Sequence, residues 1–272
     1  MSESIIPVHQ LSESAFLVFE INQTMNATFE ELHRHDFFEL IWFTRVKGDQ
    51  QVEIDFTPFP VYDNSVCILT PGQVFRMALT TQEGYVMAFS KELFKEVLED
   101  KHGYLPGIAP ARINAENKTP LSKLIQLILI EFHSQKRIPL LKTYLSAFVF
   151  HVLESSLNLQ ATSDPRINEL LRLIDQNYLE QREPIFYADL LNISLKHLNT
   201  ITKKERDATV KELIVERLLL EAKREIRFGK LSFKEIAFNL MFADPAYFSR
   251  FFKKQTGVSP EEFRAAPPDL SR

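Results

Sequence analysis

The stretch from residue 232 to residue 264 constrains the fold most, because it contains three helix-start signals in close succession. Each signal is an N-cap residue followed by proline, by glutamate three positions on, or by both, which satisfies unpaired backbone N–H groups or pre-sets the first turn. The signals are Ser232 with Glu235, Asp244 with Pro245, and Ser259 with Pro260 and Glu262. We therefore expect three short helices, the first two joined by a tight turn.

The middle helix of this stretch is predicted to have one apolar and one basic side. Phe248, Phe251 and Phe252 recur at spacings of three and four, which places them on one helical face. Arg250 and Lys253 fall mostly on the other side, where an anion could meet them. A short helix, a turn and a second helix with a basic outer face outline a helix-turn-helix, although a solvated surface helix with a few lysines fits the same pattern.

The same stretch resembles the second helix-turn-helix of the AraC family of bacterial transcription regulators. The resemblance rests on apolar, aromatic and polar anchors, namely Ile236, Ala237, Phe242, Asp244, Tyr247, Phe248, Arg250, Phe252, Lys253, Gly257, Pro260, Phe263 and Arg264. One position departs from the family, because Met241 stands in the turn where glycine is usual. Glycine adopts positive φ easily and methionine does not, so the turn is either helical enough to accept Met241 or strained.

An earlier segment, ADLLNISLKHLNTITKKE over residues 188–205, resembles the first helix-turn-helix of the same family. Leu195 and Leu198 are predicted to face inward, with polar and basic residues on the outer face. The segment that follows, residues 206–209, departs from the glycine-containing version of the family.

A long helix is predicted between the two units. It begins at the capping box of Thr209 and Glu212 and ends at Gly229. At ~1.5 Å per residue it spans about 28 Å, close to the ~34 Å of one DNA turn. A rigid spacer of this size could hold two recognition helices in successive major grooves.

The resemblance implies which side chains would meet DNA. Base edges would be contacted by Lys196, Asn199 and Thr200 in the first unit and by Pro245, Ala246 and Arg250 in the second. The proline and the alanine offer only apolar contact, for instance with a thymine methyl group, whereas the forked guanidinium of Arg250 can bind guanine with two hydrogen bonds. A phosphate contact or a surface ion pair is the other interpretation of Arg250. Mainly phosphates would be touched by Lys203, Lys204, Lys253 and Lys254.

Length and charge divide the chain into two parts. Its 272 residues favour two domains over one. Residues 165–265 carry 18 Lys+Arg against 15 Asp+Glu, whereas residues 1–164 carry 13 against 20. The acidic part would not hold DNA non-specifically. A single cysteine, Cys67, indicates a reducing compartment, and neither a signal peptide nor a membrane-spanning run is evident, so we expect a cytoplasmic protein.

The first 90 residues show the pattern of a small β-sandwich or barrel. Within the run at 51–56, Val52, Ile54 and Phe56 are expected to share one face. Pro71 and Gly72 mark a turn. Apolar or alternating runs predict strands over residues 16–21, 37–44, 51–56, 66–69 and 85–89.

Two histidines and a carboxylate lie close together in this part, in the order His33-Arg-His35-Asp-Phe-Phe-Glu39. Histidines two apart on a strand point the same way, and the carboxylate could complete an open metal site. The pattern resembles the first metal motif of cupins and the same region of AraC-type N-terminal domains. The further histidine of a cupin site is missing, because Phe75 holds its expected position. We therefore predict no metal, and either local hydrogen bonds or an effector pocket lined by His33, His35, Glu39, Trp42 and Phe75.

Helices are predicted after the strands. Residues 90–102 have a capped amphipathic pattern, and residues 104–120, with three prolines, are expected to be irregular. Two apolar helices follow over residues 121–135 and 139–157. Their surplus apolar surface is either ordinary core or a dimer seam, which the resemblance favours. The polar residues 158–165 predict the interdomain linker.

The sequence thus predicts an α+β multidomain protein. A cupin-like β-barrel sensory domain is expected over residues 1–108, a helical dimerisation segment over 109–160 and an all-α double helix-turn-helix domain over 165–266. The resemblance implies a homodimeric regulator of transcription that binds double-stranded DNA, with a small-molecule effector and RNA polymerase as further partners, and without enzymatic activity, cofactor or membrane association. Two other classes stay open. A cupin-type metalloprotein would hold metal, and a ligand-binding adaptor would lack salt-dependent DNA binding.

Overall fold

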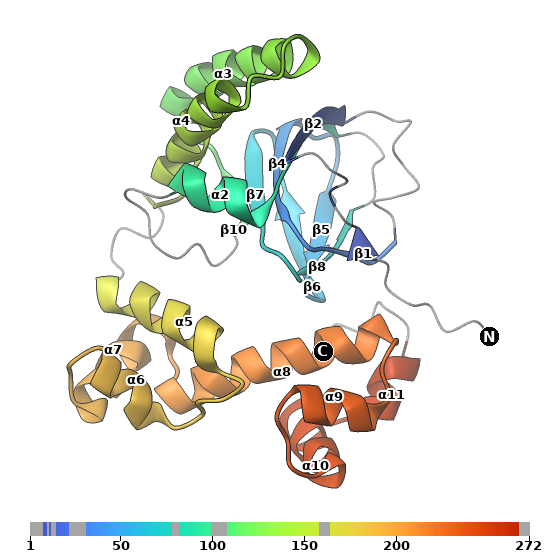
Figure 1. Ribbon diagram of the computed structural model, residues 1–272, viewed down its shortest axis with the longest axis vertical. Coiled ribbons are helices and arrows are strands. Elements are labelled where there is room, and N and C mark those ends of the chain that lie inside the picture. The colour runs from blue at the N-terminus through green and yellow to red at the C-terminus, as the bar shows by residue number, and fades with distance from the viewer. Residues whose placement is uncertain are drawn as a thin grey trace. The chain divides into compact units, whose positions relative to one another are not determined.

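The computed structural model describes residues 8–9, 11, 15–21, 31–77, 82–98, 108–157 and 164–266. These residues fall into two compact units, one over residues 8–157 and the other over residues 164–266. In the described residues, the first unit combines strands with the helices α2, α3 and α4, and the second unit contains helices and no strand (Figure 1). The predicted linker lies mostly outside the described residues. Within the described parts of the chain, no helix combines the length and the apolar character needed to cross a membrane.

Two sheets form the first unit, each with five strands among the described residues. One sheet has the order β1 (Val8–His9), β3 (His33–His35), β8 (Val74–Met77), β5 (Gln50–Ile54) and β6 (Thr57–Val61). The other has the order β10 (Ile108–Arg112), β7 (Ser65–Leu69), β4 (Phe38–Arg45), β9 (Glu83–Phe89) and β2 (Phe16–Ile21). Apart from the parallel β1–β3 pair, the pairs are antiparallel. This arrangement confirms the predicted cupin-like architecture.

The strand β4 is buried on both faces, which explains why its sequence is almost continuously apolar. Ile41 and Phe43 belong to the core between the two sheets, together with Val52, Phe75 and Met77 of the opposite sheet. Leu40 and Trp42 point the other way and pack against helices. Successive side chains on a strand alternate between faces, so one strand serves two cores.

Three helices cover the outer face of this sheet, namely α2 (Lys91–Leu98), α3 (Ala115–His133) and α4 (Ile138–Leu157) (Figure 1). Leu121 and Ile125 of α3 and Leu145 and Phe148 of α4 share one core with the sheet. The helices predicted over 121–135 and 139–157 are thus packed on the barrel rather than forming a separate body. The predicted end of the helix that begins after Ser90 lies outside the described residues.

Prolines explain why two edge strands and the start of one helix were not predicted from the sequence. The segment 104–120, expected to be irregular, contains β10 and the beginning of α3. Pro110 lies in the edge strand β10, where the register shifts, and Pro120 lies inside α3, in its second turn, where it removes one backbone hydrogen bond of the helix. The strand β6 also escaped prediction, because its sequence is TPFPV at a sheet edge. Phe56 does not continue β5 as predicted, since it lies in the β5–β6 turn with a φ of 67°.

The second unit consists of helices within the described residues, and the last four of them begin at the predicted capping signals. The helices are α5 (Pro165–Asn177), α6 (Pro184–Leu190), α7 (Leu195–Arg206), α8 (Val210–Phe228), α9 (Phe233–Asn239), α10 (Pro245–Thr256) and α11 (Pro260–Ala265). The capping boxes at Thr209, Ser232 and Ser259 are all formed, and Asp244 accepts hydrogen bonds at the start of α10. In one of these boxes, hydrogen bonds from the hydroxyl and the backbone N–H of Ser232 lower the pKa of Glu235.

The α6–α7 and α9–α10 pairs have the same turn. Ile193 N–H donates to Ala188 O at 3.1 Å, and Phe242 N–H donates to Ala237 O at 2.9 Å. The residue before each donor is left-handed, with a φ of 53° at Asn192 and 55° at Met241. Of the two alternatives for Met241, the structure therefore selects the strained one, because a side chain of this kind pays to adopt positive φ.

We expect Met241→Gly to stabilise the second unit by about 1 kcal/mol, since glycine removes the left-handed strain at an exposed position where little packing is lost. Asn192→Gly is the matched control and should gain less, because asparagine tolerates this conformation. Hydrogen exchange of amides in residues 164–266 under mild urea measures both variants. Equal gains, or a loss in Met241→Gly, would contradict the assignment of strain.

Candidate nucleic-acid interface

The helix α7 presents basic residues to solvent. Lys196, Thr200, Lys203 and Lys204 are exposed, while Leu198 is fully buried in the core of the unit. The Thr200 hydroxyl donates to Lys196 O of its own helix at 3.0 Å, which leaves the hydroxyl oxygen as an acceptor. This is the outer face that the sequence predicts.

Asn199 differs from the other predicted contact positions on α7. It is only half-exposed, and its Oδ1 accepts the Val210 N–H at 3.0 Å, at the start of α8. The amide oxygen therefore links the two helices. Only the remaining polar group of this side chain is left for a base.

The helix α10 has a sharper division of its faces. Ala246, Arg250, Lys253 and Lys254 are exposed, and Pro245 is half-buried at the first position. Phe248 and Phe252 are fully buried, as predicted. The packed aromatic face fixes the helix, so that its basic face points away from the core of the unit.

Arg250 is only loosely held. Its Nη2 lies 3.9 Å from Asp244 Oδ2, and its side chain is 69% exposed. The Asp244 carboxylate is already engaged, because it accepts the backbone N–H groups of Ala246 at 3.0 Å and Tyr247 at 3.1 Å. The guanidinium can therefore turn to another acceptor at little cost.

Tyr247 is a surface residue that the sequence interpretation did not assign to the interface. Its side chain is 56% exposed, and the Arg250 guanidinium carbon lies 6.0 Å from its ring centroid. Tyr247, Arg250 and Lys254 follow the spacing i, i+3 and i+7 and so share a face. That spacing was visible in the sequence, where Tyr247 serves only as an anchor of the family resemblance.

Both recognition-helix candidates end with a left-handed residue. Asp207 closes α7 with a φ of 54°, and Gly257 closes α10 with a φ of 82°. Asp207 thus replaces the glycine of the family after the first helix-turn-helix and keeps the same left-handed backbone conformation. Aspartate tolerates this conformation better than most residues do.

The five residues predicted to line one effector pocket do not lie together. His35 Nε2 is 3.2 Å from Glu39 Oε2, and the rings of His33 and Phe75 are 5.6 Å apart, so these four residues form a buried cluster. His33 Nδ1 also contacts Glu31 O at 2.7 Å, which is the local bonding foreseen as an alternative.

Trp42 is separated from that cluster by the backbone of its own strand. It lies on the opposite face of β4 from Glu39 and packs on Phe148 with 5.7 Å between ring centroids. Positions 39 and 42 have opposite parity on a strand, so the alternation of side chains could have excluded a shared pocket. Within the described residues, no group of three His, Cys, Asp or Glu side chains is arranged to hold a metal ion.

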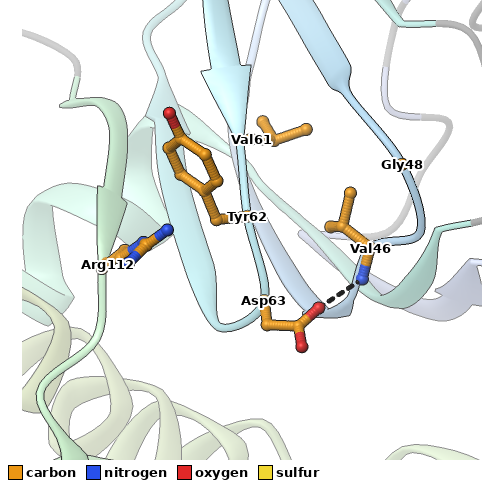
Figure 2. Close-up of a pocket in the computed structure, with 6 residues that line it drawn as sticks. All are labelled: Val46, Gly48, Val61, Tyr62, Asp63 and Arg112. Atoms are coloured by element: carbon orange, nitrogen blue, oxygen red, sulfur yellow. Dashed lines mark hydrogen bonds between the residues drawn. The ribbon is translucent and has the colours of Figure 1, made fainter.

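A surface pocket of about 320 Å³ lies elsewhere on the first unit, at one end of the sheets. Figure 2 shows Arg112 of β10 directed toward the ring of Tyr62, and Asp63 hydrogen-bonded to the Val46 backbone. The Arg112 guanidinium carbon lies 4.2 Å from the Tyr62 centroid, and Asp63 Oδ1 accepts Val46 N–H at 2.7 Å. The lining residues are Val46, Gly48, Val61, Tyr62, Asp63 and Arg112.

Two helix-turn-helix units on one long helix, following a cupin-like unit, define a class of proteins in which a DNA-binding module accompanies a ligand-binding domain. Comparison with known families agrees with this class. Residues 17–149 match the AraC-like ligand binding domain, and residues 187–266 match a helix-turn-helix domain. The chain belongs to the AraC family of transcription regulators.

Relatives cover different shares of the chain. The Msm operon regulatory protein of Streptococcus mutans is 27% identical over 54% of this chain and 50% of its own length, and the transcriptional activator RhaS of Escherichia fergusonii is 29% identical over 38% and 37%. This chain thus spans half or less of these two relatives. The HTH-type transcriptional regulator YfiF of Bacillus subtilis is 23% identical over 96% of this chain and 88% of its own.

Among solved structures, an apo ToxT variant from Vibrio cholerae is similar at 17% identity, covers 93% of this chain and 97% of its own, and gives a TM-score of 0.45.

Proposed function

We propose that this protein is a sequence-specific DNA-binding regulator of transcription, with α7 and α10 as its recognition helices. The observation that carries the proposal is the repetition of one helix-turn-helix geometry, including the left-handed turn residue, at the two ends of α8 (Figure 1). The 19 residues of α8 correspond to about 28 Å, which suits successive major grooves.

The roles of the side chains follow from their freedom to move. Arg250 is exposed and weakly paired, so it is our choice for direct contact with guanine in the major groove. Lys203, Lys204, Lys253 and Lys254 are exposed at the later turns of their helices and would bind phosphates. On α7, Lys196 and Thr200 would contact bases, and Asn199 would contribute mainly by fixing α7 to α8.

We expect Arg250→Ala to weaken binding to the cognate DNA site by about 1–3 kcal/mol and to relax the preference at one base pair. Lys253→Ala is the matched control. It should weaken all sequences alike and lower the slope of log K against log salt by about 0.9. The site is first selected from random duplexes with the full chain, and fluorescence anisotropy at several salt concentrations then measures each variant. Equal losses for Arg250→Ala on selected and random DNA would exclude the base contact.

An organic anion is the effector class that the first unit suits best. The core between the sheets holds apolar side chains, of which Ile41, Phe43 and Phe75 are fully buried, beside the buried side chains of His33, His35 and Glu39. The pocket beside β10 instead offers a cation, an aromatic ring and apolar side chains, and the carboxylate in its lining, that of Asp63, accepts the Val46 backbone N–H. Arg112 has no carboxylate partner within the described residues, and an arginine fork matches a carboxylate or phosphate well.

We expect carboxylate or phosphate metabolites that raise the melting temperature of the full chain to lose this effect in Arg112→Ala. Arg45→Ala is the control, because Arg45 is an exposed arginine of the same unit that pairs with Glu83 at 3.6 Å. Thermal shift with a panel of organic acids makes the comparison. A metabolite that stabilises both variants as strongly as the unchanged protein binds elsewhere, and would exclude this pocket for that ligand.

A homodimer would form through the α3–α4 hairpin. Leu127, Ile130, Ile138 and Phe150 of these helices are 42–66% exposed, although the opposite faces of the same helices are fully packed. Exposed apolar side chains on a helix pair are typical of a surface that another chain covers. Contact with RNA polymerase stays a prediction of the family resemblance.

We expect Ile130→Asp to convert the dimer to monomer at micromolar concentration. Ile130 is 66% exposed in the single chain, and a carboxylate at this position would become buried and unpaired in the dimer, which is costly. Ile185→Asp is the control, since Ile185 is an isoleucine of similar exposure, 52%, on α6 of the other unit. Sedimentation equilibrium measures both. Unchanged association of Ile130→Asp would remove this face from the interface.

A further inference from the structure

The two helix-turn-helix units are joined by α8 and also by a side chain that crosses between them. Arg182 lies in the short segment between α5 and α6, beside the first helix-turn-helix. Its Nη2 donates a hydrogen bond to Leu240 O at the C-terminus of α9, which belongs to the second helix-turn-helix. Its guanidinium carbon lies 4.6 Å from the centroid of Phe242, in the turn before α10.

This contact suits an arginine. The last carbonyl groups of a helix have no donor within the helix and carry its partial negative charge, so a cationic donor satisfies both needs at Leu240. The ring face of Phe242 adds a cation–π contact. Burial lowers the pKa of Arg182, but an arginine pKa starts so high that the guanidinium stays charged at neutral pH.

The segment that carries Arg182 is itself fixed to the helices of the first helix-turn-helix. Tyr187 of α6, which is fully buried, donates its hydroxyl hydrogen to Gln181 O at 2.6 Å. Gln181 N–H in turn donates to Asn177 O, at the end of α5, at 2.8 Å. The residue next to Arg182 is therefore tied to both α5 and α6.

On the other side of the contact, Phe242 is central to the packing of α10. Its ring centroid lies 5.2 Å from that of Phe251, 5.3 Å from that of Phe248 and 5.9 Å from that of Tyr247. A displacement of Phe242 would therefore displace the aromatic side chains through which α10 is packed, and with them the whole helix and its basic face.

We infer that Arg182 is a positioning residue that fixes α10 relative to α7, so that both recognition helices meet DNA in one register. The helix α8 alone sets the distance between the two helix-turn-helix units, but it leaves each of them able to bend and twist at its end of the helix. A cross-link that includes a charged hydrogen bond restricts those motions before DNA binds, which lowers the ordering cost of binding. The DNA part of the inference rests on the proposed function, whereas the positioning part does not.

The first experiment measures the geometry without DNA. Spin labels are placed at Arg206→Cys, the last residue of α7, and Gln255→Cys, an exposed residue near the end of α10, in a full chain whose single cysteine is replaced by Cys67→Ala. We expect Arg182→Met to widen the measured distance distribution. Arg172→Met is the matched control, since Arg172 pairs with Glu169 and Gln176 of its own helix and should leave the distribution unchanged. An unchanged distribution in Arg182→Met overturns the inference.

The second experiment measures the consequence for DNA. We expect Arg182→Met to lose about tenfold in affinity for a selected site that spans both recognition helices, the size of one charged hydrogen bond, and to keep its affinity for random DNA. The preference for one spacing, tested by inserting a base pair between the half-sites, should also weaken. Equal losses on selected and random DNA overturn the register role.

The two experiments separate the inference from the proposed function. If the full chain binds no DNA, the proposed function fails, and the distance measurement still decides whether Arg182 positions α10. If Arg182→Met does not fold, as judged by circular dichroism, Arg182→Lys replaces it. That variant keeps a donor for Leu240 but loses the flat guanidinium, so we expect a smaller widening of the distance distribution. An unchanged distribution in Arg182→Lys would overturn the inference.

Discussion

The packing of α7 and α10 onto α8 through their apolar faces determines where the basic side chains of the second unit can lie. Leu198, Phe248 and Phe252 are fully buried in one core with Leu218 and Ala222 of α8. Because these side chains fix the rotation of each helix about its own axis, the lysines and Arg250 have only the outer faces left. The net charge of +3 over residues 165–265 is modest, but nearly all the residues proposed for DNA contact are concentrated on these two faces.

Local signals were sufficient to predict the helices of this unit. A cap depends on residues within one turn, so Ser232 with Glu235 or Asp244 with Pro245 could be recognised without any knowledge of the fold. The conformation of Met241 could be posed as a question but not answered, since both a helical and a left-handed turn fitted the sequence. The Arg182 contact could not be predicted, because it joins residues 58 positions apart and depends on the tertiary structure.

The first unit was harder to predict for two physical reasons. Prolines exclude residues from central strands but not from edges, so β6 and β10 were missed although their neighbours were found. Residue types alone predict one effector pocket, whereas the alternation of side chains along β4 puts Glu39 and Trp42 on opposite faces. Glu39 and Trp42 are both buried, but in different cores, so burial alone does not make two residues neighbours. The sequence does not single out Arg112 and Tyr62, because the prolines of residues 104–120 predict an irregular segment where β10 lies.

The double burial of β4 has a mechanical consequence. A strand is a single layer of backbone, and here it is the common wall of the barrel core and of the core beneath the α3–α4 hairpin. Interiors are close-packed, so a change of side-chain volume at Ile41 on one side displaces the backbone that carries Leu40 and Trp42 on the other. The position of the hairpin, and with it the surface proposed for dimerisation, is therefore set partly by the contents of the barrel.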